Sequence, residues 1–412
     1  MRSRIAGGGD LKILTIFGTR PEAIKMAPLV QALSREPSVT SVVCVTGQHR
    51  EMLDQVLDAF DIRPDFDLAL MAANQGLNGL SSAALAALDP VLNEVQPDRV
   101  LVHGDTTTAM AAALAAFHRR IPVGHVEAGL RTYHLDRPFP EEMNRRVVDV
   151  VSDLLFAPTP RARENLMGER LEGRILVTGN TVIDALMATQ ARIAADDALR
   201  ATLDAPFAHL DPARRLLLVT GHRRENFGEG FLQICKALGE IAQRDDVEIV
   251  YPVHLNPNVR EPVREALSGR ANVHLIAPLD YLPFQRLMKR ADIVLTDSGG
   301  VQEEAPALGK PVLVMRDVTE RPEAVEAGTV QLVGTRATAI VSAVSALLDD
   351  AGTYAGFASR ANPYGDGLAC RRIVDVICGR AVEAFIPSSS SRAQPGSLDG
   401  AAPLSLCSAS RS

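Results

Sequence analysis

Short apolar runs alternate with longer amphipathic segments along almost the whole chain. Each run is only a few residues long and rich in Val, Ile and Leu, which is typical of a buried strand, whereas the segments between runs are long enough for helices. This alternation predicts strand–helix–strand units with parallel strands. The predicted strands are residues 13–17, 42–45, 100–102, 123–126, 154–156, 175–177, 216–219, 248–252, 273–276, 293–295, 312–315 and 330–333.

The predicted strands form two series with a gap near residues 180–215. Because 412 residues exceed the size of most single domains, we expect two doubly wound α/β domains, at residues 11–185 and 186–370. A helix predicted at residues 371–384 is expected to cross back and complete the first domain. Ligands of open parallel sheets bind beyond the carboxyl ends of the strands, so we predict an active site in the cleft between the domains.

The composition excludes several classes of protein. The chain is 46% hydrophobic and 23% charged, as in ordinary globular proteins, and its net charge of −7 argues against a nucleic-acid partner. Residues 1–10 lack the apolar core of a signal peptide, and the uncharged stretch 68–88 holds too many Asn, Gln and Ser residues to span a membrane. We therefore expect a cytoplasmic protein with no membrane partner. Residues 1–10 are expected to be a flexible extension, and the Ser-rich residues 387–412 a disordered tail.

A glycine-rich turn, SGG at residues 298–300, follows the predicted strand 293–295. No side chain hinders the backbone N–H groups at the start of the next helix, which suits a phosphate or diphosphate. Glu304 lies one and a half turns into that helix, where a carboxylate can accept both hydroxyls of a ribose. Alternatively, the glycines could be present only because the geometry of a strand-to-helix turn requires them. Glu304, Lys310 and Arg321 together favour a nucleotide site.

The first predicted strand ends in a second motif that suits an anion, GTRPE at residues 18–22. Pro21 fits the first turn of a helix, which places Arg20 at the mouth of the helix and Lys25 one turn further in. An arginine beside a helix start is well placed to bind a phosphate or a leaving oxyanion, although an ordinary surface arginine fits the same pattern.

Three carboxylates, Asp105, Glu127 and Glu141, follow neighbouring strands of the first series. A parallel sheet gathers such positions along one edge, and several acids in one cleft suit the removal or return of a proton on carbon. Asp105 could instead cap the next helix. The histidines nearby, His103 and His125, match no standard metal motif, so we expect no metal site.

The second series contributes His222, which stands between Gly and Arg after a predicted buried strand. Such a histidine can donate to a phosphate or act as general acid toward a leaving oxygen, although a lone histidine is more often structural. A turn-rich loop at residues 251–258 is aimed at the same edge of the sheet. Phe284 could stack on a base, but its residue type alone favours the core.

Taken together, these motifs resemble the bacterial non-hydrolysing UDP-N-acetylglucosamine 2-epimerase family. The resemblance rests on GTRPEAIKMAPLV, TGQHREML, HGDTTT, HVEAGLRT, RPFPEEMNRR, TGHRREN, PVHLNP, DSGGVQEEAP and GKPVLVMRDVTERPEAV, and covers residues 11 to about 380. Any one of these motifs is weak evidence. Their order and spacing make the match specific.

The resemblance implies a GT-B fold, with the active site between two Rossmann-like domains, and a homodimer. It implies reversible epimerisation at C2 of UDP-N-acetylglucosamine to UDP-N-acetylmannosamine. The reaction would proceed by elimination of UDP to 2-acetamidoglucal and re-addition of UDP, and would supply precursors of cell-envelope polysaccharides. No cofactor is expected, because nothing is oxidised. The expected partners are thus the two UDP-sugars, UDP and a second copy of the chain.

The resemblance also assigns roles to residues of this sequence. The implied catalytic set is Asp105, Glu127, Glu141 and His222. The residues implied around UDP are Arg20, Lys25, Phe284, Ser298, Gly299, Gly300, Glu304 and Arg321. An allosteric site for a second substrate molecule would use Gln48, Glu51, Arg223 and His254, with Glu141 shared. Glu51 stands where some regulated members carry glutamine, and its charge would repel a phosphate.

Three rival functions stand beside this one. A hydrolysing relative would release UDP and free N-acetylmannosamine, but the segments TGHRREN and QHREML favour the non-hydrolysing type. A GT-B glycosyltransferase would share the diphosphate-binding half, yet it has no evident use for three acids in the first domain. A regulator that only binds a UDP-sugar would not need these acids either.

Overall fold

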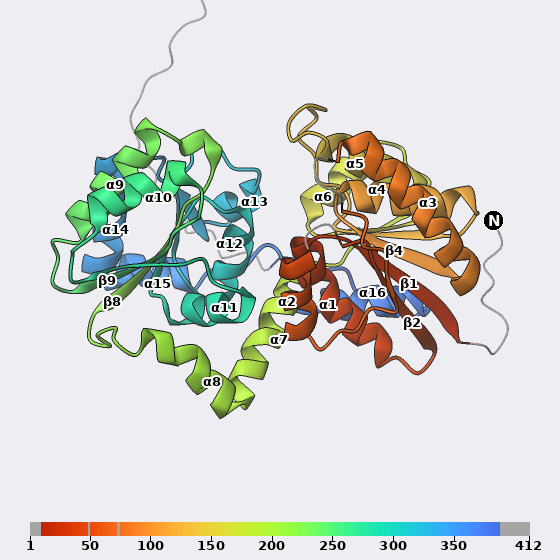
Figure 1. Cartoon of the computed structure of the whole chain (residues 1–412), viewed down its shortest axis with the longest axis horizontal. Coiled ribbons are helices and arrows are strands. Elements are labelled where there is room, and N and C mark those ends of the chain that lie inside the picture. The colour runs from red at the N-terminus through yellow and green to blue at the C-terminus, as the bar shows by residue number, and fades with distance from the viewer. Residues whose placement is uncertain (1–9, 48–49, 72–74, 388–412) are drawn as a thin grey trace, which may run out of the picture.

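The computed structural model of the chain describes residues 10–47, 50–71 and 75–387. Two parallel sheets, each with helices packed against it, form two domains that lie side by side (Figure 1). The strands of the first sheet are β1 (Leu11–Phe17), β2 (Val39–Val45), β3 (Phe66–Asp67), β4 (Arg99–His103), β5 (Val123–Val126), β6 (Leu154–Ala157) and β7 (Arg174–Val177). Those of the second sheet are β8 (Arg215–Thr220), β9 (Val247–Pro252), β10 (Val273–Ile276), β11 (Ile293–Thr296), β12 (Val312–Val314) and β13 (Val330–Leu332).

Helices follow the strands in alternation. In the first half of the chain they are α1 (Arg20–Ser34), α2 (Arg50–Ala59), α3 (Leu77–Val95), α4 (Thr107–His118), α5 (Glu141–Val151), α6 (Pro160–Gly168), α7 (Thr181–Ala195) and α8 (Asp197–Asp204). In the second half they are α9 (Glu229–Ile241), α10 (Pro257–Leu267), α11 (Tyr281–Arg290), α12 (Gly299–Glu304), α13 (Pro322–Glu326), α14 (Ala337–Asp349), α15 (Ala351–Ala358) and α16 (Ala369–Ile377). Short 3-10 turns occur at Ala205–Phe207, Arg224–Asn226 and Ala305–Leu308.

Every predicted strand is present, and no strand end differs from its predicted position by more than three residues. The structure adds β3, which has only two residues and is too short to produce a periodic pattern. The pairings are parallel in both sheets. The prediction of two Rossmann-like α/β domains is therefore confirmed.

The strand order places a crevice at the centre of each sheet. The first sheet runs β3-β2-β1-β4-β5-β6-β7, and the second runs β10-β9-β8-β11-β12-β13. The strand order changes direction between β1 and β4 in the first sheet, and between β8 and β11 in the second, so each of these pairs is a topological switch point. The connections that leave such a pair diverge, and they open a space beyond the carboxyl ends of the strands.

Both faces of each sheet are buried, which explains why the strands are continuously apolar. Along β1, Ile13 and Phe17 belong to the core cluster on one face, whereas Leu14 and Ile16 belong to the cluster on the other. Side chains of a strand point alternately to opposite faces, so each run of apolar residues supplies two cores at once.

The last helix returns to the first domain. α16 lies beside α1 and β1 in Figure 1, and its Ile373 and Ile377 share a core cluster with Phe17. The predicted extent of this helix, residues 371–384, was wrong at its carboxyl end. Gly379 takes a left-handed conformation (φ 72°) just beyond the cap residue, which ends the helix at Ile377.

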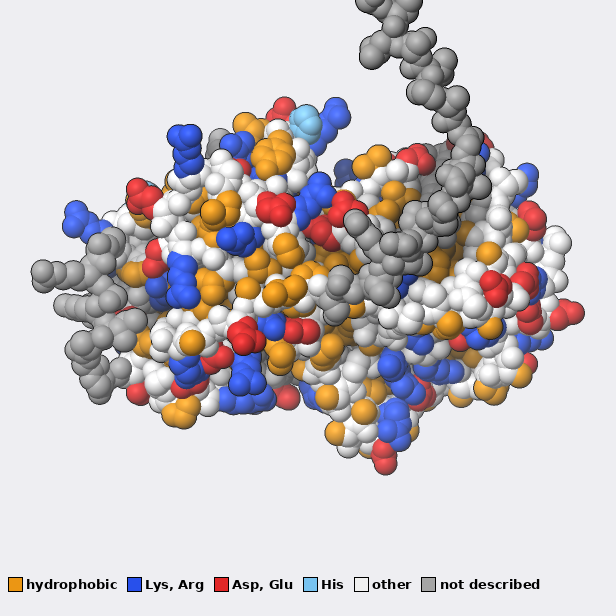
Figure 2. All heavy atoms as spheres, turned by 180° about the vertical axis from the view of Figure 1, so that it is seen from behind, with side chains coloured by type: hydrophobic (Ala, Val, Ile, Leu, Met, Phe, Trp, Pro, Cys, Tyr) orange, Lys and Arg blue, Asp and Glu red, His pale blue; other side chains and the backbone are white. Residues whose placement is uncertain are grey.

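Two other expectations concern the ends of the chain and its surface. Of the predicted extension 1–10 and tail 387–412, all but Asp10 and Pro387 lie outside the described residues. Within the described part of the chain, no helix is both long and apolar enough to cross a membrane. Acidic and basic side chains are interspersed over the face of the molecule seen in Figure 2.

Candidate active site

The turn between β1 and α1 fixes the first wall of the candidate site. Thr19 caps α1, and Glu22 accepts the backbone N–H groups of Gly18 and Thr19 at 3.0 and 2.8 Å. The hydroxyl of Thr106 donates to the other oxygen of Glu22 at 2.7 Å, which ties this turn to the one after β4. A Cβ on Gly18 would lie 2.1 Å from Oγ1 of Thr46, so only glycine fits here.

This turn delivers Arg20 and Lys25 as predicted from the sequence. Arg20 is the first residue of α1, and Lys25 follows one turn later. The Lys25 ammonium forms an ion pair with Glu127, at the end of β5, and lies 3.9 Å from Oε2 of Glu303 in α12. Burial alone would lower the pKa of Lys25, but the charges of Glu127 and Glu303 outweigh it and raise the pKa. Lys25 is therefore a cation shared by both domains.

Glu127 is the centre of the buried group. Its backbone is in the left-handed region (φ 66°), and its Oε2 accepts from Lys25 and, at 2.8 Å, from Nδ2 of Asn180. Burial would raise the pKa of Glu127, but the ammonium of Lys25 overcomes this and holds the pKa below the usual value of a carboxyl. Nε2 of His103 lies 3.8 Å from the same oxygen. Burial lowers the pKa of His103 to about 3, so its ring is neutral.

The imidazole of His103 is itself almost fully buried. Neither of its ring nitrogens has a hydrogen-bond partner within the described part of the chain, although the side chain is 4% exposed. A buried imidazole that lacks partners costs free energy, which functional sites tolerate when a ligand supplies the missing bond. The sequence pointed to His103 only as a rejected metal ligand.

Asp105 lies two residues after His103, and Glu141 lies about one turn before the α5 residues Asn144 and Arg145, which donate to Asp105. Asp105 accepts from NH2 of Arg145 at 2.5 Å, and its backbone carbonyl accepts from Asn144 at 2.9 Å. The alternative that Asp105 caps a helix was wrong, because Thr106 is the N-cap of α4. Glu141 is the first residue of α5, and its Oε2 is buried without a partner among the described residues. Such an oxygen is free to accept a proton or a hydroxyl.

The second domain places His222 at the end of β8. The backbone N–H groups of His222 and Arg223 donate to Oδ2 of Asp297 at 2.9 and 2.8 Å, and Nδ1 of His222 lies 3.3 Å from Oδ1. Asp297 is fully buried at the end of β11, so it joins the turns after β8 and β11. Burial lowers the pKa of His222 against the opposing charge of Asp297. The sequence did not predict this role of Asp297.

The SGG turn lies where it was predicted. Ser298 is the cap residue of α12, and Gly299 and Gly300 are its first two residues. Among the described residues, a Cβ on Gly300 would meet no atom within 4 Å outside its own helix, whereas one on Gly299 would lie 3.2 Å from Oε1 of Glu320 and 3.6 Å from NH2 of Arg321. Arg321 itself donates to Oε1 of Glu303 at 2.5 Å. The turn is therefore open at Gly300, whereas at Gly299 it faces the carboxylate of Glu320 and the guanidinium of Arg321.

Glu304 lies behind this turn and is buried. It accepts from Nε2 of Gln285 at 2.9 Å. Burial, with the charge of Glu303, raises the pKa of Glu304 to about 8, and Arg20 and Lys25 oppose this rise only in part. Arg20 thus lies close enough to act electrostatically on Glu304 across the two domains. Phe284, on the preceding helix α11, is partly buried against the core of the second domain.

Lys310 was wrongly grouped with these residues. It precedes β12, and its charged neighbours are Asp292, Lys289 and Arg215. Asp292 and Arg215 stand at the amino ends of β11 and β8. Since the site lies at the carboxyl ends of the strands, Lys310 is at the opposite edge of the sheet.

The residues predicted for a second substrate molecule are placed only in part. His254, on the predicted loop after β9, stacks on His222 with ring centroids 5.9 Å apart. Arg223 donates to Oε1 of Glu320 at 2.9 Å. Gln48 lies outside the described residues, and Glu51 lies in α2, where its side chain is not described.

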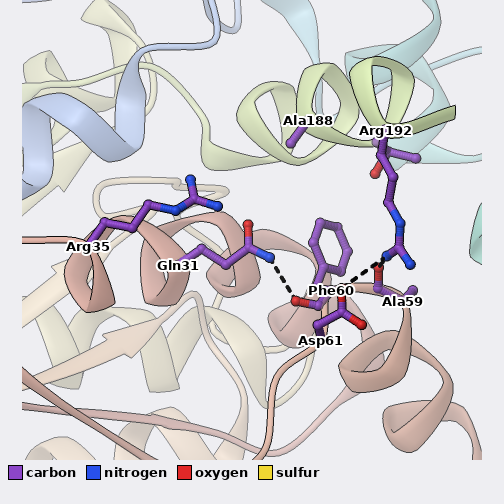
Figure 3. A pocket seen from close by; sticks show the side chains of 8 residues that line it. Gln31, Arg35, Ala59, Phe60, Asp61, Ala188 and Arg192 are labelled. Carbon is purple, nitrogen blue, oxygen red and sulfur yellow. Dashed lines mark hydrogen bonds and ion pairs between the residues drawn. The ribbon is translucent and has the colours of Figure 1, made fainter. Parts of the chain in front are cut away.

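A separate cavity of about 390 Å³ lies at the far ends of α1 and α2, against α7 (Figure 3). Gln31 and Arg192 donate to the carbonyls of Phe60 and Ala59 there, and so cap the end of α2. The cavity contains none of the residues predicted for the site. Its lining residues are Gln31, Arg35, Ala59, Phe60, Asp61, Ala188, Thr189 and Arg192.

Comparison with known proteins gives a consistent result. A family model described as UDP-N-acetylglucosamine 2-epimerase matches residues 31–378. The UDP-N-acetylglucosamine 2-epimerase of Escherichia coli K12 is 57% identical over 369 residues, which are 89% of this chain and 98% of that protein. The corresponding protein of Yersinia pestis is 58% identical over the same length and the same shares of both chains.

Solved structures agree in fold. The UDP-GlcNAc 2-epimerase of Neisseria meningitidis, bound to UDP-GlcNAc, matches with a TM-score of 0.83 and 49% identity over 90% of this chain and 100% of that one. The enzyme of Methanocaldococcus jannaschii, in complex with UDP-GlcNAc and UDP, matches with a TM-score of 0.73 and 34% identity over the same shares. The whole two-domain architecture is therefore common to these proteins.

Proposed function

The chain belongs to the UDP-N-acetylglucosamine 2-epimerase family, and we propose that it interconverts UDP-N-acetylglucosamine and UDP-N-acetylmannosamine by inversion at C2. The observation that carries this proposal is the buried ion pair of Glu127 with Lys25, whose ammonium also lies near Glu303 of α12, the helix that begins at the SGG turn. Acids on one side of a sugar and cations on the other are what an elimination from a sugar diphosphate needs.

In the proposed reaction, a carboxylate removes the proton on C2 while the bond from C1 to the UDP oxygen breaks. The electron pair of the C2–H bond forms the C1=C2 double bond of 2-acetamidoglucal, and UDP takes the pair of the broken C1–O bond. UDP then adds back at C1, and a proton is delivered to C2 from the opposite face. No electrons are gained or lost overall, so the reaction requires no redox cofactor.

The catalytic set we propose is Asp105, Glu127, Glu141 and His222. Glu127 remains ionised beside Lys25, but the same ion pair lowers its pKa and weakens it as a base, so it would have to separate from Lys25 to accept the proton efficiently. The unpartnered Oε2 of Glu141 suits contact with the sugar or the moving proton. His222, held by Asp297, suits donation of a hydrogen bond to the departing diphosphate.

UDP would lie between the domains. We propose that Ser298, Gly299 and Gly300 bind the diphosphate through backbone N–H groups, supported by the cations of the site, and that Glu304 accepts from the ribose hydroxyls. Phe284 would contact the base from α11. The cations are Arg20, Lys25 and Arg321.

We further propose that the protein acts as a homodimer, that a second UDP-N-acetylglucosamine activates it, and that its product enters cell-envelope polysaccharide synthesis. Family membership supports these points, and the position of His254 beside His222 supports the second. Light scattering after size exclusion tests the dimer. A sigmoidal dependence of rate on substrate concentration tests the activation.

Proton NMR of the purified protein with UDP-N-acetylglucosamine in D2O, with no cofactor added, tests the main proposal. Signals of UDP-N-acetylmannosamine with deuterium at C2 are expected, because the returning proton comes from solvent. Free N-acetylmannosamine with UDP would indicate the hydrolysing reaction instead. An unchanged spectrum with intact substrate binding would favour a glycosyltransferase or a binding protein.

A further inference from the structure

Glu320, in the connection between β12 and α13, covers the SGG turn. A Cβ on Gly299 would lie 3.2 Å from Oε1 of Glu320, closer than any other atom outside the adjacent residues. The same Cβ would lie 3.6 Å from the guanidinium nitrogens of Arg223 and Arg321. A carboxylate therefore occupies the open face of the turn, between two arginines.

Three guanidinium groups surround this carboxylate. NH2 of Arg223 donates to Oε1 at 2.9 Å, NH1 of Arg316 donates to Oε2, and NH1 of Arg321 lies 3.9 Å from Oε1. Burial would raise the pKa of Glu320, but Arg321 and Arg223 lower it to about 2. The carboxylate is therefore ionised at any working pH and held by charge-assisted hydrogen bonds.

Two further acids form hydrogen bonds with the same arginines. Glu225 accepts from Nε of Arg316 at 2.6 Å, and Glu303 accepts from Nε of Arg321 at 2.5 Å. Arg223, by contrast, has Glu320 as its only salt-bridge partner in the described part of the chain. Loss of Glu320 would thus leave an excess of positive charge at the face of Gly299.

We propose that Glu320 is an internal substitute for the diphosphate: its carboxylate occupies the position of a phosphate group when the site is empty, and the incoming nucleotide displaces it. This inference rests on the proposed function, because it takes the SGG turn as the diphosphate site. A carboxylate and a phosphate both offer paired anionic oxygens to guanidinium groups, so one can replace the other. In its bound position the side chain of Glu320 is already one-third exposed, so the nucleotide can push it toward solvent.

This arrangement has two consequences for binding. The arginines are held in place before the nucleotide arrives, which lowers the entropy lost on binding. The nucleotide must break the contacts of Glu320, which weakens its affinity and favours its release. A purely structural Glu320 would only orient the arginines, and its removal would weaken binding instead of strengthening it. The sign of the effect therefore decides between the two roles.

The test compares UDP affinity of the wild-type protein and Glu320→Gln by calorimetry at constant ionic strength. We expect the variant to bind UDP about three- to thirty-fold more tightly. Uridine, which has no diphosphate, should bind both proteins equally. Weaker or unchanged UDP binding by a variant with wild-type circular dichroism and thermal melting would overturn the proposal.

Glu225→Gln is the matched control, because it removes the same charge from Arg316 without uncovering Gly299. Its UDP affinity should stay within about twofold of the wild type. If it gains as much affinity as Glu320→Gln, a general charge effect explains the data and the proposal fails. Wild-type protein that binds UDP but does not epimerise the sugar would contradict the proposed function alone, since the comparison of UDP affinities would still hold.

Discussion

The carboxamide nitrogen of Asn180 donates to Oε2 of Glu127 at 2.8 Å, and lies 3.4 Å from Oε2 of Glu303. Its oxygen accepts the backbone N–H of Val182 and so caps α7, the helix that leads out of the first domain. One amide thus connects an acid of the first domain, an acid of the second and the segment between them. The placement of the two domains relative to each other therefore depends on the buried charges of Glu127 and Glu303.

Asn180→Asp should separate the two functions of this amide. Aspartate caps a helix as well as asparagine does, but it places a third carboxylate beside Glu127 and Glu303. We expect a loss of roughly 1–3 kcal/mol in the free energy of unfolding at about pH 8, and recovery of part of it at about pH 5, where the new acid can be protonated. Urea denaturation at both pH values measures this. An equal loss of unfolding free energy at both pH values would indicate that the substitution weakens the cap of α7 and that the added negative charge is not the cause.

Asp105→Asn should lower turnover without weakening UDP binding. The amide keeps the shape of the side chain and can still accept from Arg145, but it cannot exchange a proton. We expect kcat to fall about 10²- to 10⁴-fold, with the Kd for UDP within about threefold of wild type. Asp153→Asn, which removes an exposed acid at the amino end of β6, is the control and should leave kcat unchanged. Weakened UDP binding in Asp105→Asn would favour a structural role.

Glu304 should make the protein less stable as the pH rises. Its pKa is about 8 in the folded protein and 4.5 in its ordinary state, so between these values the folded state binds more protons than the unfolded state. Below about pH 4.5 this carboxyl is protonated in both states, and its contribution to the free energy of unfolding is fully present. That contribution is lost as the pH rises through about 8, because the folded protein must then give up the proton or unfold. We expect Glu304→Gln to be more stable than the wild type at about pH 9, by roughly 2–4 kcal/mol, and similar to it at about pH 5. Denaturant unfolding across this pH range measures the difference. If the free energies of unfolding of the two proteins changed in parallel with pH, this prediction would be refuted.

Two glycines should respond in opposite ways to the same substitution. In Gly18→Ala the new methyl group would overlap Oγ1 of Thr46, and we expect a loss of about 1–3 kcal/mol in unfolding free energy. In Gly300→Ala the methyl group meets no described atom outside its own helix, so stability should be equal or slightly higher. UDP binding by Gly300→Ala should nevertheless weaken about tenfold, because the methyl group covers backbone that we assign to the diphosphate. Unfolding curves measure the stabilities, and calorimetry measures UDP binding. Unchanged UDP binding by Gly300→Ala would show that Gly300 does not contact the diphosphate.

The sequence alone was sufficient for the strands and for most of the site's location. A strand in a parallel sheet is buried on both faces, so its continuous apolar run is visible without any knowledge of its partners. Residues that follow such strands gather at one edge by topology, and Arg20, Asp105, Glu127, His222 and the SGG turn lie at that edge. Lys310 was misplaced because it precedes its strand, where the same topology assigns it to the opposite edge.

Only the tertiary structure decided which charges meet. Asn180 and Glu303 are separated by 123 residues, Arg223 and Glu320 by 97, and His222 and Asp297 by 75, and no periodic pattern records such pairs. Each contact depends on the phase of a helix and on how the two domains lie against each other. Local hydrophobic spacing therefore determined the sheets and the edge at which chemistry gathers. Long-range packing determined the partners, and with them the protonation states of Glu127, His103 and Glu304.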